Sequence, residues 1–217
     1  MARLPAIEPI NAGLLVVDMQ NGFCHIDGDL GRRGQGEPLR DVVPNVGRLV
    51  DVFHSAGLPV FWSRQEHELE DLTREGRLLE THIQKQRHLP CLRGTWDAEI
   101  EGSLAARLGP NDYVFAKHRA SCFYSTTLDV ALRMRGIQLL VVCGVTTNYC
   151  VDSTVRDAYA RDYDVIVVRD CCAALYPDLH EASLRNVDQY HGVTATLVEV
   201  SEAVARGSPA APSTASA

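Results

Sequence analysis

The chain has 217 residues, 46% of them hydrophobic, which is enough for one α/β domain with a sizeable core. Its formal net charge of -7 argues against nucleic acid as the main partner, because a phosphate backbone favours a basic protein face. No segment approaches the roughly 20 apolar residues that span a bilayer, and the N-terminus lacks a charged start followed by an apolar run. We therefore expect no membrane partner, no signal peptide and a cytoplasmic protein.

The first predicted elements are two strands separated by a helix. Residues 13–17 (GLLVV) form an apolar run that ends at Asp18, which is typical of a buried strand. Apolar residues at offsets of three and four predict a helix over 39–53, and Gly57 is expected to end it. The apolar residues 58–62 predict the second strand.

A long segment without clear periodicity follows the second strand. Residues 64–95 carry several charges, and we interpret them as an excursion from the sheet with a short helix near 68–86. The excursion is long for a loop in a compact domain. Its length indicates one of two roles: a lid that covers a site, or a contact between subunits.

Strands and helices alternate in the second half of the chain. Strands are predicted over 113–116, 137–143, 165–168 and 194–200, and helices over 125–136, 148–161 and about 180–190. The alternation predicts an α/β fold of three layers (α/β/α), with helices on both faces of a mostly parallel six-stranded sheet. We expect a single domain over residues 1–205 and a disordered tail over 206–217, whose residues are small, polar and interrupted by proline.

Three polar residues lie at or just beyond predicted strand ends. Asp18 follows the first strand, Lys117 the third, and Cys150 lies in the turn that leads out of the fourth. Ligands of such sheets bind beyond the carboxyl ends of the strands, where residues distant in sequence converge. Alone, each has a simpler explanation, because an aspartate there often only forms a turn and a buried cysteine usually packs as a small hydrophobe.

Cys150 is the most informative of the seven cysteines. Their odd number and the lack of a compartment signal favour free thiols, and no C-x-x-C pair indicates a zinc site. Cys150 opens a helix, whose positive end favours a thiolate, as would a nearby lysine. An adjacent carboxylate could take the thiol proton, and the free peptide N–H groups of the helix start could bind an oxyanion. The pattern predicts a nucleophile that needs no metal.

Three segments resemble the isochorismatase-like cysteine hydrolase superfamily. They are LLVVDMQNGFC, FAKHRASCFYSTTLD and VVCGVTTNYCVDSTVRDAYARDYDVIVVRD, and the resemblance extends over about residues 12 to 200. It implies that Asp18 is the general base and acid, Lys117 a supporting cation and Cys150 the nucleophile.

The resemblance also implies a particular geometry before the cysteine. Members of the superfamily usually have a non-proline cis peptide bond there, which in this chain would join Val145 to Thr146. Its expected use is to direct the N–H of Thr146, together with that of Cys150, at the oxyanion.

The resemblance further separates this chain from other members. Nicotinamidases carry an Asp-x-His motif and a further histidine that bind a metal, whereas the corresponding FWSRQEHELEDL has His67 without an aspartate two residues before it. We therefore expect no metal and no other cofactor. Isochorismatases that cleave a vinyl ether generally lack the nucleophilic cysteine. The stretches KHRASCFYSTTLD and GTWDAEI look more like members acting on carbamoyl or ureido compounds, such as N-carbamoylsarcosine amidase, ureidoacrylate amidohydrolase and biuret hydrolase.

Residues next to the three strand ends are candidates for substrate binding. We expect Phe23 and Tyr124 to line a pocket and Arg119 to receive a polar or anionic end of the substrate. His25 and His118 are adjacent to the proposed site, and the sequence leaves open whether they tune its polarity or point to solvent.

The sequence thus predicts a cysteine-dependent amidohydrolase. It would cleave a C–N bond of a small amide, carbamoyl or ureido compound through a thioester and release ammonia or an amine. Two alternatives stay open: hydrolysis of an ether or ester on the same fold, and a non-catalytic protein that uses its thiols for redox chemistry or binding. The resemblance implies a homodimer or homotetramer, and the substrate itself is left open.

Overall fold

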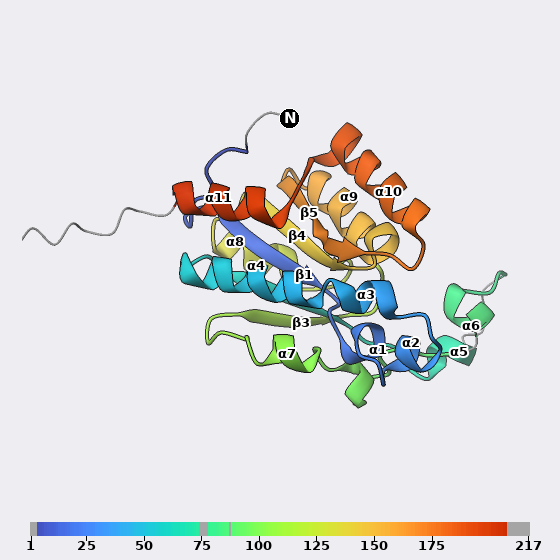
Figure 1. Ribbon diagram of the computed structural model, residues 1–217. Coiled ribbons are helices and arrows are strands. Elements are labelled where there is room, and N and C mark those ends of the chain that lie inside the picture. Colours follow the sequence, from blue (N-terminus) through green and yellow to red (C-terminus); the bar gives the residue numbers. More distant parts are fainter. Residues whose placement is uncertain (1–3, 74–77, 87, 208–217) are drawn as a thin grey trace, which may run out of the picture.

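The structure is a computed structural model that describes residues 4–73, 78–86 and 88–207. A sheet of six parallel strands forms its centre, in the order β3-β2-β1-β4-β5-β6 (Figure 1). The strands are β1 (Ala12–Val17), β2 (Val60–Gln65), β3 (Tyr113–Lys117), β4 (Leu139–Val145), β5 (Asp164–Ala173) and β6 (Val193–Ala195). The predicted six-stranded α/β fold is confirmed.

The helices that connect the strands vary widely in length. Those described are α1 (Asn21–Cys24), α2 (Asp29–Arg32), α3 (Glu37–Asp41), α4 (Val43–Ser55), α5 (Glu70–Thr73), α6 (His82–Gln86), α7 (Gly102–Ala105), α8 (Leu128–Met134), α9 (Asp152–Tyr159), α10 (Pro177–Asn186) and α11 (Leu197–Gly207). A 3₁₀ turn, η1 (Trp96–Ala98), and two π turns, η2 (Thr147–Val151) and η3 (Val187–His191), complete the set. None of these helices combines the length and the apolar character that crossing a bilayer requires.

Helices cover both faces of the sheet. On one face α4 packs against α11, β1 and β5, and on the other α9 and α10 contact β5 (Figure 1). All six residues of β1 are buried, as expected for a central strand covered on both sides. The strand order reverses between β1 and β4, and the crevice at such a reversal is where doubly wound sheets bind their ligands.

The predicted strand over 194–200 is wrong in its second half. β6 ends at Ala195, and α11 begins two residues later. The reason is a capping box: the Thr196 hydroxyl accepts from the Glu199 N–H at 3.2 Å, and the Glu199 carboxylate accepts from the Thr196 N–H at 2.7 Å. Of the predicted disordered tail, Arg206 and Gly207 belong to α11, and residues 208–217 lie outside the described part of the chain.

Two other predicted elements divide in the structure. The helix over 39–53 is interrupted, and α4 has a proline near its start, where a missing N–H costs no helical hydrogen bond. The helix over 148–161 begins as the π turn η2 and continues as α9. The excursion over 64–95 first extends β2 to Gln65 and then holds α5 and α6, while residues 74–77 and 87 lie outside the description.

Candidate active site

Asp18 and Lys117 form a fully buried ion pair at the carboxyl edge of the sheet. Asp18 directly follows β1 and Lys117 ends β3, with β2 between the two strands. Lys117 Nζ lies 2.7 Å from Asp18 Oδ2, and both side chains have an exposed fraction of 0%. Charges enclosed in this way are costly unless they are paired and hydrogen-bonded. The sheet therefore brings together two of the three residues that the sequence selects.

Ser63 fixes the carboxylate of Asp18. It is buried in β2, opposite Val17 of β1. Its hydroxyl donates to Asp18 Oδ1 at 2.7 Å and accepts from the Asp18 N–H at 3.1 Å. Asp18 has a φ of 52°, in the left-handed region that few non-glycine residues adopt. The two bonds to Ser63 hold this turn and direct the carboxylate toward Lys117.

Gly144 allows β4 to approach the same place. Its φ is 113°, and a Cβ atom there would lie 2.1 Å from the carbonyl oxygen of Val17. Only glycine therefore fits between β4 and the end of β1. The chain that follows carries the Val145–Thr146 peptide bond, which is cis, and then η2 with Cys150.

Cys150 completes the cluster. Lys117 Nζ lies 3.4 Å from Cys150 Sγ, and the cysteine is 7% exposed. The Thr154 hydroxyl donates to the Cys150 carbonyl oxygen at 2.7 Å and accepts from the Cys122 N–H at 3.0 Å. Thr154 thus fixes the start of α9 on the loop after β3. All three predicted strand-end residues converge.

The structure favours a neutral thiol at Cys150, whereas the helix start alone favours a thiolate. Burial raises the pKa of Cys150 well above its usual range, and the Asp18 carboxylate raises it further, although the Lys117 ammonium lowers it. Burial alone would lower the pKa of Lys117, but the Asp18 carboxylate raises it, so the ammonium stays charged. The thiol proton must therefore leave during the reaction rather than before it.

A cavity of about 470 Å³ opens above Cys150. Phe23, Arg119 and Thr146 line it, and so does His118. Tyr124 is not among its lining residues and is 59% exposed, so the structure does not place this predicted pocket residue at the site.

His25 also lies away from the cavity. Its ring packs edge-on against Trp96, with the ring centroids 4.9 Å apart. His118, by contrast, lines the cavity, and its Nδ1 lies 2.9 Å from the Glu66 carbonyl oxygen.

The excursion forms the outer wall of the cavity. Thr81, His82 and Ile83 of the α6 region line it, together with His67 and Asp71. The ring of His82 packs edge-on against Tyr149, the neighbour of Cys150, at 5.2 Å between centroids. A lid is one of the two roles that the sequence predicts for this segment, and its position fits that role.

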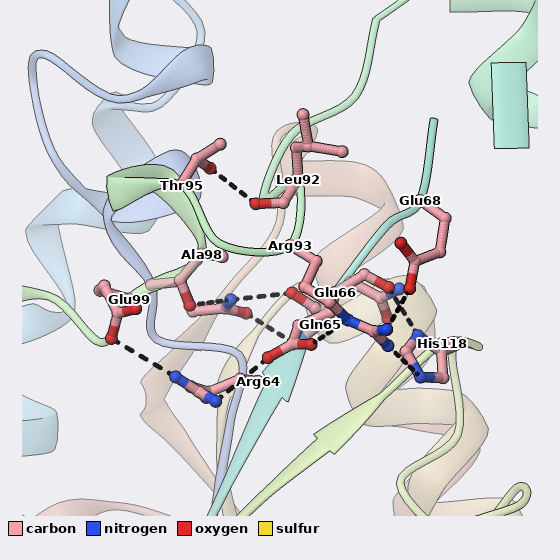
Figure 2. A network of polar contacts seen from close by, with 11 residues as sticks. Arg64, Gln65, Glu66, Glu68, Leu92, Arg93, Thr95, Ala98, Glu99 and His118 are labelled. Atoms are coloured by element: carbon pink, nitrogen blue, oxygen red, sulfur yellow. Dashed lines mark hydrogen bonds and ion pairs between the residues drawn. The ribbon is translucent and has the colours of Figure 1, made fainter. Parts of the chain in front are cut away.

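The wall is joined to the sheet by a network of charged side chains. Glu66 accepts from Arg64 at 3.1 Å and from Arg93 at 2.9 Å. Arg93 also contacts Glu68, and its guanidinium lies 3.0 Å from His118 Nε2 (Figure 2). The network ties the end of β2 to the chain around Arg93 and to the loop after β3.

The histidines of the wall are not arranged around a metal. Among the described residues, no group of three or more His, Cys, Asp or Glu side chains is placed to hold an ion. His67 Nδ1 instead lies 3.3 Å from Asp71 Oδ2. Burial lowers the pKa of His67 and of His82, which favours their neutral forms.

The isochorismatase domain family matches residues 12–199 of the chain. The chain belongs to the isochorismatase family. A probable inactive nicotinamidase of Arabidopsis thaliana is 36% identical over 197 residues, which cover 90% of this chain and 97% of that protein. A ureidoacrylate amidohydrolase of Methylobacterium radiotolerans is 33% identical over 205 residues, covering 86% and 77% of the two chains.

Solved structures of the family share the fold. A cysteine hydrolase of Pseudomonas syringae superposes with a TM-score of 0.80 at 28% identity, over 95% of this chain and 100% of that one. An N-carbamoylsarcosine amidase of Thermoplasma acidophilum superposes with a TM-score of 0.71 at 28% identity, over 86% and 96%.

Three residues that contact the cluster of this isochorismatase-family site are not predicted by the sequence analysis. Ser63 and Gln65 lie in β2, and Thr154 lies one turn after Cys150. The available signals were the polar residues that follow the apolar run of β2 and the place of Gln65 in the segment where nicotinamidases carry a metal motif that this chain lacks. Neither shows which neighbour a polar strand residue would meet, since that depends on the register between β1, β2 and β3.

Proposed function

We propose that the chain is a cysteine-dependent amidohydrolase that acts on a small amide, carbamoyl or ureido compound. One observation carries the proposal: Lys117 Nζ lies 3.4 Å from Cys150 Sγ and 2.7 Å from Asp18 Oδ2, at the base of a cavity. A thiol, a carboxylate and a fixed positive charge are the groups that acyl transfer through a thioester requires. Its relatives include a ureidoacrylate amidohydrolase and an N-carbamoylsarcosine amidase, which supports the proposal that the bond cleaved is a C–N bond.

The first half of the reaction forms the thioester. Asp18 takes the thiol proton as Cys150 Sγ attacks the carbonyl carbon of the substrate. The oxyanion that forms is held by the N–H groups of Thr146 and Cys150, and the Lys117 ammonium offsets the added negative charge. When the tetrahedral intermediate collapses, the C–N bond breaks, and the departing nitrogen takes the proton from Asp18.

The second half restores the enzyme. Asp18 takes a proton from a water molecule, and the resulting hydroxide attacks the thioester carbonyl. Collapse of the second tetrahedral intermediate breaks the C–S bond, and Cys150 recovers the proton from Asp18. Lys117 stays protonated throughout, so the net reaction consumes one water and releases ammonia or an amine.

The test is a comparison of cysteine variants on a substrate panel. Ammonia release is measured with biuret, N-carbamoyl amino acids, ureidoacrylate, nicotinamide and maleamate, and the compound turned over is then given to Cys150→Ala and Cys150→Ser. Both should lose activity by at least about a thousandfold, because the covalent step is lost. Cys143→Ala, which changes a buried cysteine of β4, is the matched control and should retain turnover.

Three results would contradict the proposal. Near wild-type turnover by both Cys150 variants would exclude the thioester. Release of an alcohol from ethers or esters, without ammonia from any amide, would favour the alternative hydrolase. All seven cysteines are free and buried in the structure. Several equally reactive thiols in iodoacetamide labelling would favour the redox or binding alternative.

We also propose that the enzyme acts in the cytoplasm as a homodimer or homotetramer. Leu78 and Leu79, in the excursion, are exposed by 102% and 81%, and a contact between subunits would cover them. Light scattering on the eluting protein should give a mass of two or four chains. A monomer at micromolar concentration would contradict the assembly.

A further inference from the structure

Gln65 has a rigid main chain beside the catalytic cluster. It ends β2, pairs in register with Lys117 of β3, and is 5% exposed. Its N–H donates to Gln20 Oε1 at 2.8 Å, and Gln20 Nε2 donates to the Gln65 carbonyl oxygen at 2.9 Å and to that of Ala98 at 2.8 Å (Figure 2). Both main-chain groups of Gln65 are therefore fixed by one buried side chain.

The orientation of the Gln65 amide is fixed as well. Lys117 Nζ donates to Gln65 Oε1 at 2.8 Å. An ammonium group can only donate, so the amide must turn its oxygen toward Lys117 and its nitrogen away. Among the residues that the structure describes, none accepts a hydrogen bond from Gln65 Nε2, although the residue lines the cavity above Cys150. Nε2 keeps access to the cavity, so an acceptor of a bound molecule can take the place of water there.

We propose that Gln65 is a specificity-determining residue, whose Nε2 donates a hydrogen bond to an acceptor oxygen that the substrate carries beyond the scissile amide. This rests on the proposed function. The scissile carbonyl oxygen is taken by the N–H groups after β4, whereas Gln65 ends β2, and Lys117 Nζ contacts both Cys150 Sγ and Gln65 Oε1. Gln65 and Cys150 line the same cavity, so a molecule bound at Cys150 meets Gln65 with its next polar group. A second carbonyl or a carboxylate supplies the required acceptor.

Gln65 could instead act only through Lys117, and two substitutions separate these roles. Gln65→Glu keeps an oxygen for Lys117 but has no N–H donor, so it removes the proposed contact and retains the one to Lys117. It also adds a negative charge, which acts equally on the two neutral compounds biuret and ethylurea. Gln65→Met keeps the length of the side chain and removes both contacts. Gln138→Glu makes the same chemical change at an exposed position and serves as the control.

The test uses pairs of compounds of similar shape that differ in the acceptor. Biuret is compared with ethylurea, and succinamate with butyramide, and kcat/KM is measured for the wild type and each variant. Gln65→Glu should lower the ratio of kcat/KM for biuret to that for ethylurea about 10- to 100-fold, as expected for one lost hydrogen bond. The ratio for succinamate and butyramide should fall further, because the new carboxylate also repels succinamate, so Gln65→Met tests that pair without the added charge. Equal losses within each pair would overturn the proposal. If thermal unfolding shows that Gln65→Glu is not folded, the test uses Gln65→Met instead. The ratio of the kcat/KM values of the two compounds in each pair then decides the outcome.

Binding separates this inference from the proposed function. The four compounds are titrated calorimetrically into Cys150→Ala with and without Gln65→Glu. A preference for biuret over ethylurea that disappears in the double variant supports the role of Gln65, even if the wild type releases no ammonia. Binding without any preference, or no binding of any compound, overturns it.

Discussion

The carboxyl edge of the sheet and the excursion that covers it are built in different ways. At the edge, Asp18, Ser63 and Lys117 have exposed fractions of 0%, 2% and 0%, and each is fixed by contacts from a neighbouring strand. The excursion contributes two short helices, α5 and α6, and carries fully exposed leucines. Asp18, Ser63 and Lys117 lie in or directly after rigid strands, whereas much of the outer pocket wall lies on a segment with little core of its own.

This difference in rigidity indicates that the sheet edge holds the reacting groups and that the excursion binds the rest of the substrate. Acyl transfer needs distances fixed within a fraction of an ångström, which parallel strands in register can provide. Recognition of the rest of the substrate tolerates more movement and can change with the loop. Substitutions at the edge should therefore affect turnover and stability together, and substitutions in the excursion should affect binding more than folding.

Asp18→Asn should give the largest effect. The amide keeps the shape but cannot take the thiol proton, so we expect kcat to fall about 100- to 10,000-fold. It also leaves the Lys117 ammonium buried without its counter-charge, which should cost about 3–5 kcal/mol in the free energy of unfolding. Steady-state kinetics and urea unfolding measure both. Asp51→Asn, in the exposed pair with Arg107, is the control and should cost at most about 1 kcal/mol. A fully active Asp18→Asn enzyme would remove Asp18 from the mechanism.

Ser63→Ala should give an intermediate effect on the same edge. It removes both hydrogen bonds that hold Asp18, leaving a buried N–H and one carboxylate oxygen without these partners. We expect a loss of about 1–3 kcal/mol in unfolding free energy and a lower kcat with little change in KM. Ser55→Ala, at an exposed serine of α4, is the control. A change confined to KM would mean that Ser63 contacts substrate instead of positioning Asp18.

The contrast between the sheet edge and the excursion also explains which features the sequence could predict. The strands were recognisable because parallel strands buried on both faces have nearly continuous apolar runs, as in GLLVV before Asp18. Their carboxyl ends identified Asp18, Lys117 and Cys150 as neighbours. The sequence contains the capping box of Thr196 and Glu199, but the apolar residues around it also fit a strand.

Other features depended on contacts that no local pattern contains. The bond between Ser63 and Asp18 follows from the register of β1 and β2. The raised pKa of Cys150 follows from how completely neighbouring elements enclose it, and the helix start alone suggested the opposite direction. The exposure of Tyr124 likewise could not be read from its proximity to Lys117 in the chain.

As the pH falls, the excursion should open locally at a higher pH than the sheet edge does. Burial lowers the pKa of His67 and His82 below the usual 6.5, although Asp71 raises both and Lys117 further lowers that of His67. The unfolded segment therefore takes up protons at a higher pH than the folded one, so the stability of the excursion is present above about pH 6.5 and is lost as the pH falls. Hydrogen exchange, corrected for intrinsic rates, should be up to about tenfold faster in residues 78–86 at pH 5.5 than at pH 7.5.

A double variant tests the origin of this pH effect. His67→Gln with His82→Gln should remove the difference between the two pH values, while exchange in β1 stays slow in all cases. Equal acceleration in β1 and in the excursion would mean that acid destabilises the whole domain.

Ile83→Ala should give the smallest effect on stability. Ile83 is 4% exposed and lines the cavity, but it is not part of the main cluster of core residues, whereas Ile137 is equally exposed and belongs to that cluster. Ile137→Ala should cost about 2–5 kcal/mol in unfolding free energy. Ile83→Ala should cost less than about 1 kcal/mol, because its segment can open without unfolding the domain, and should raise KM severalfold. If the two variants lose the same stability, the excursion is as much a part of the cooperative fold as the sheet edge.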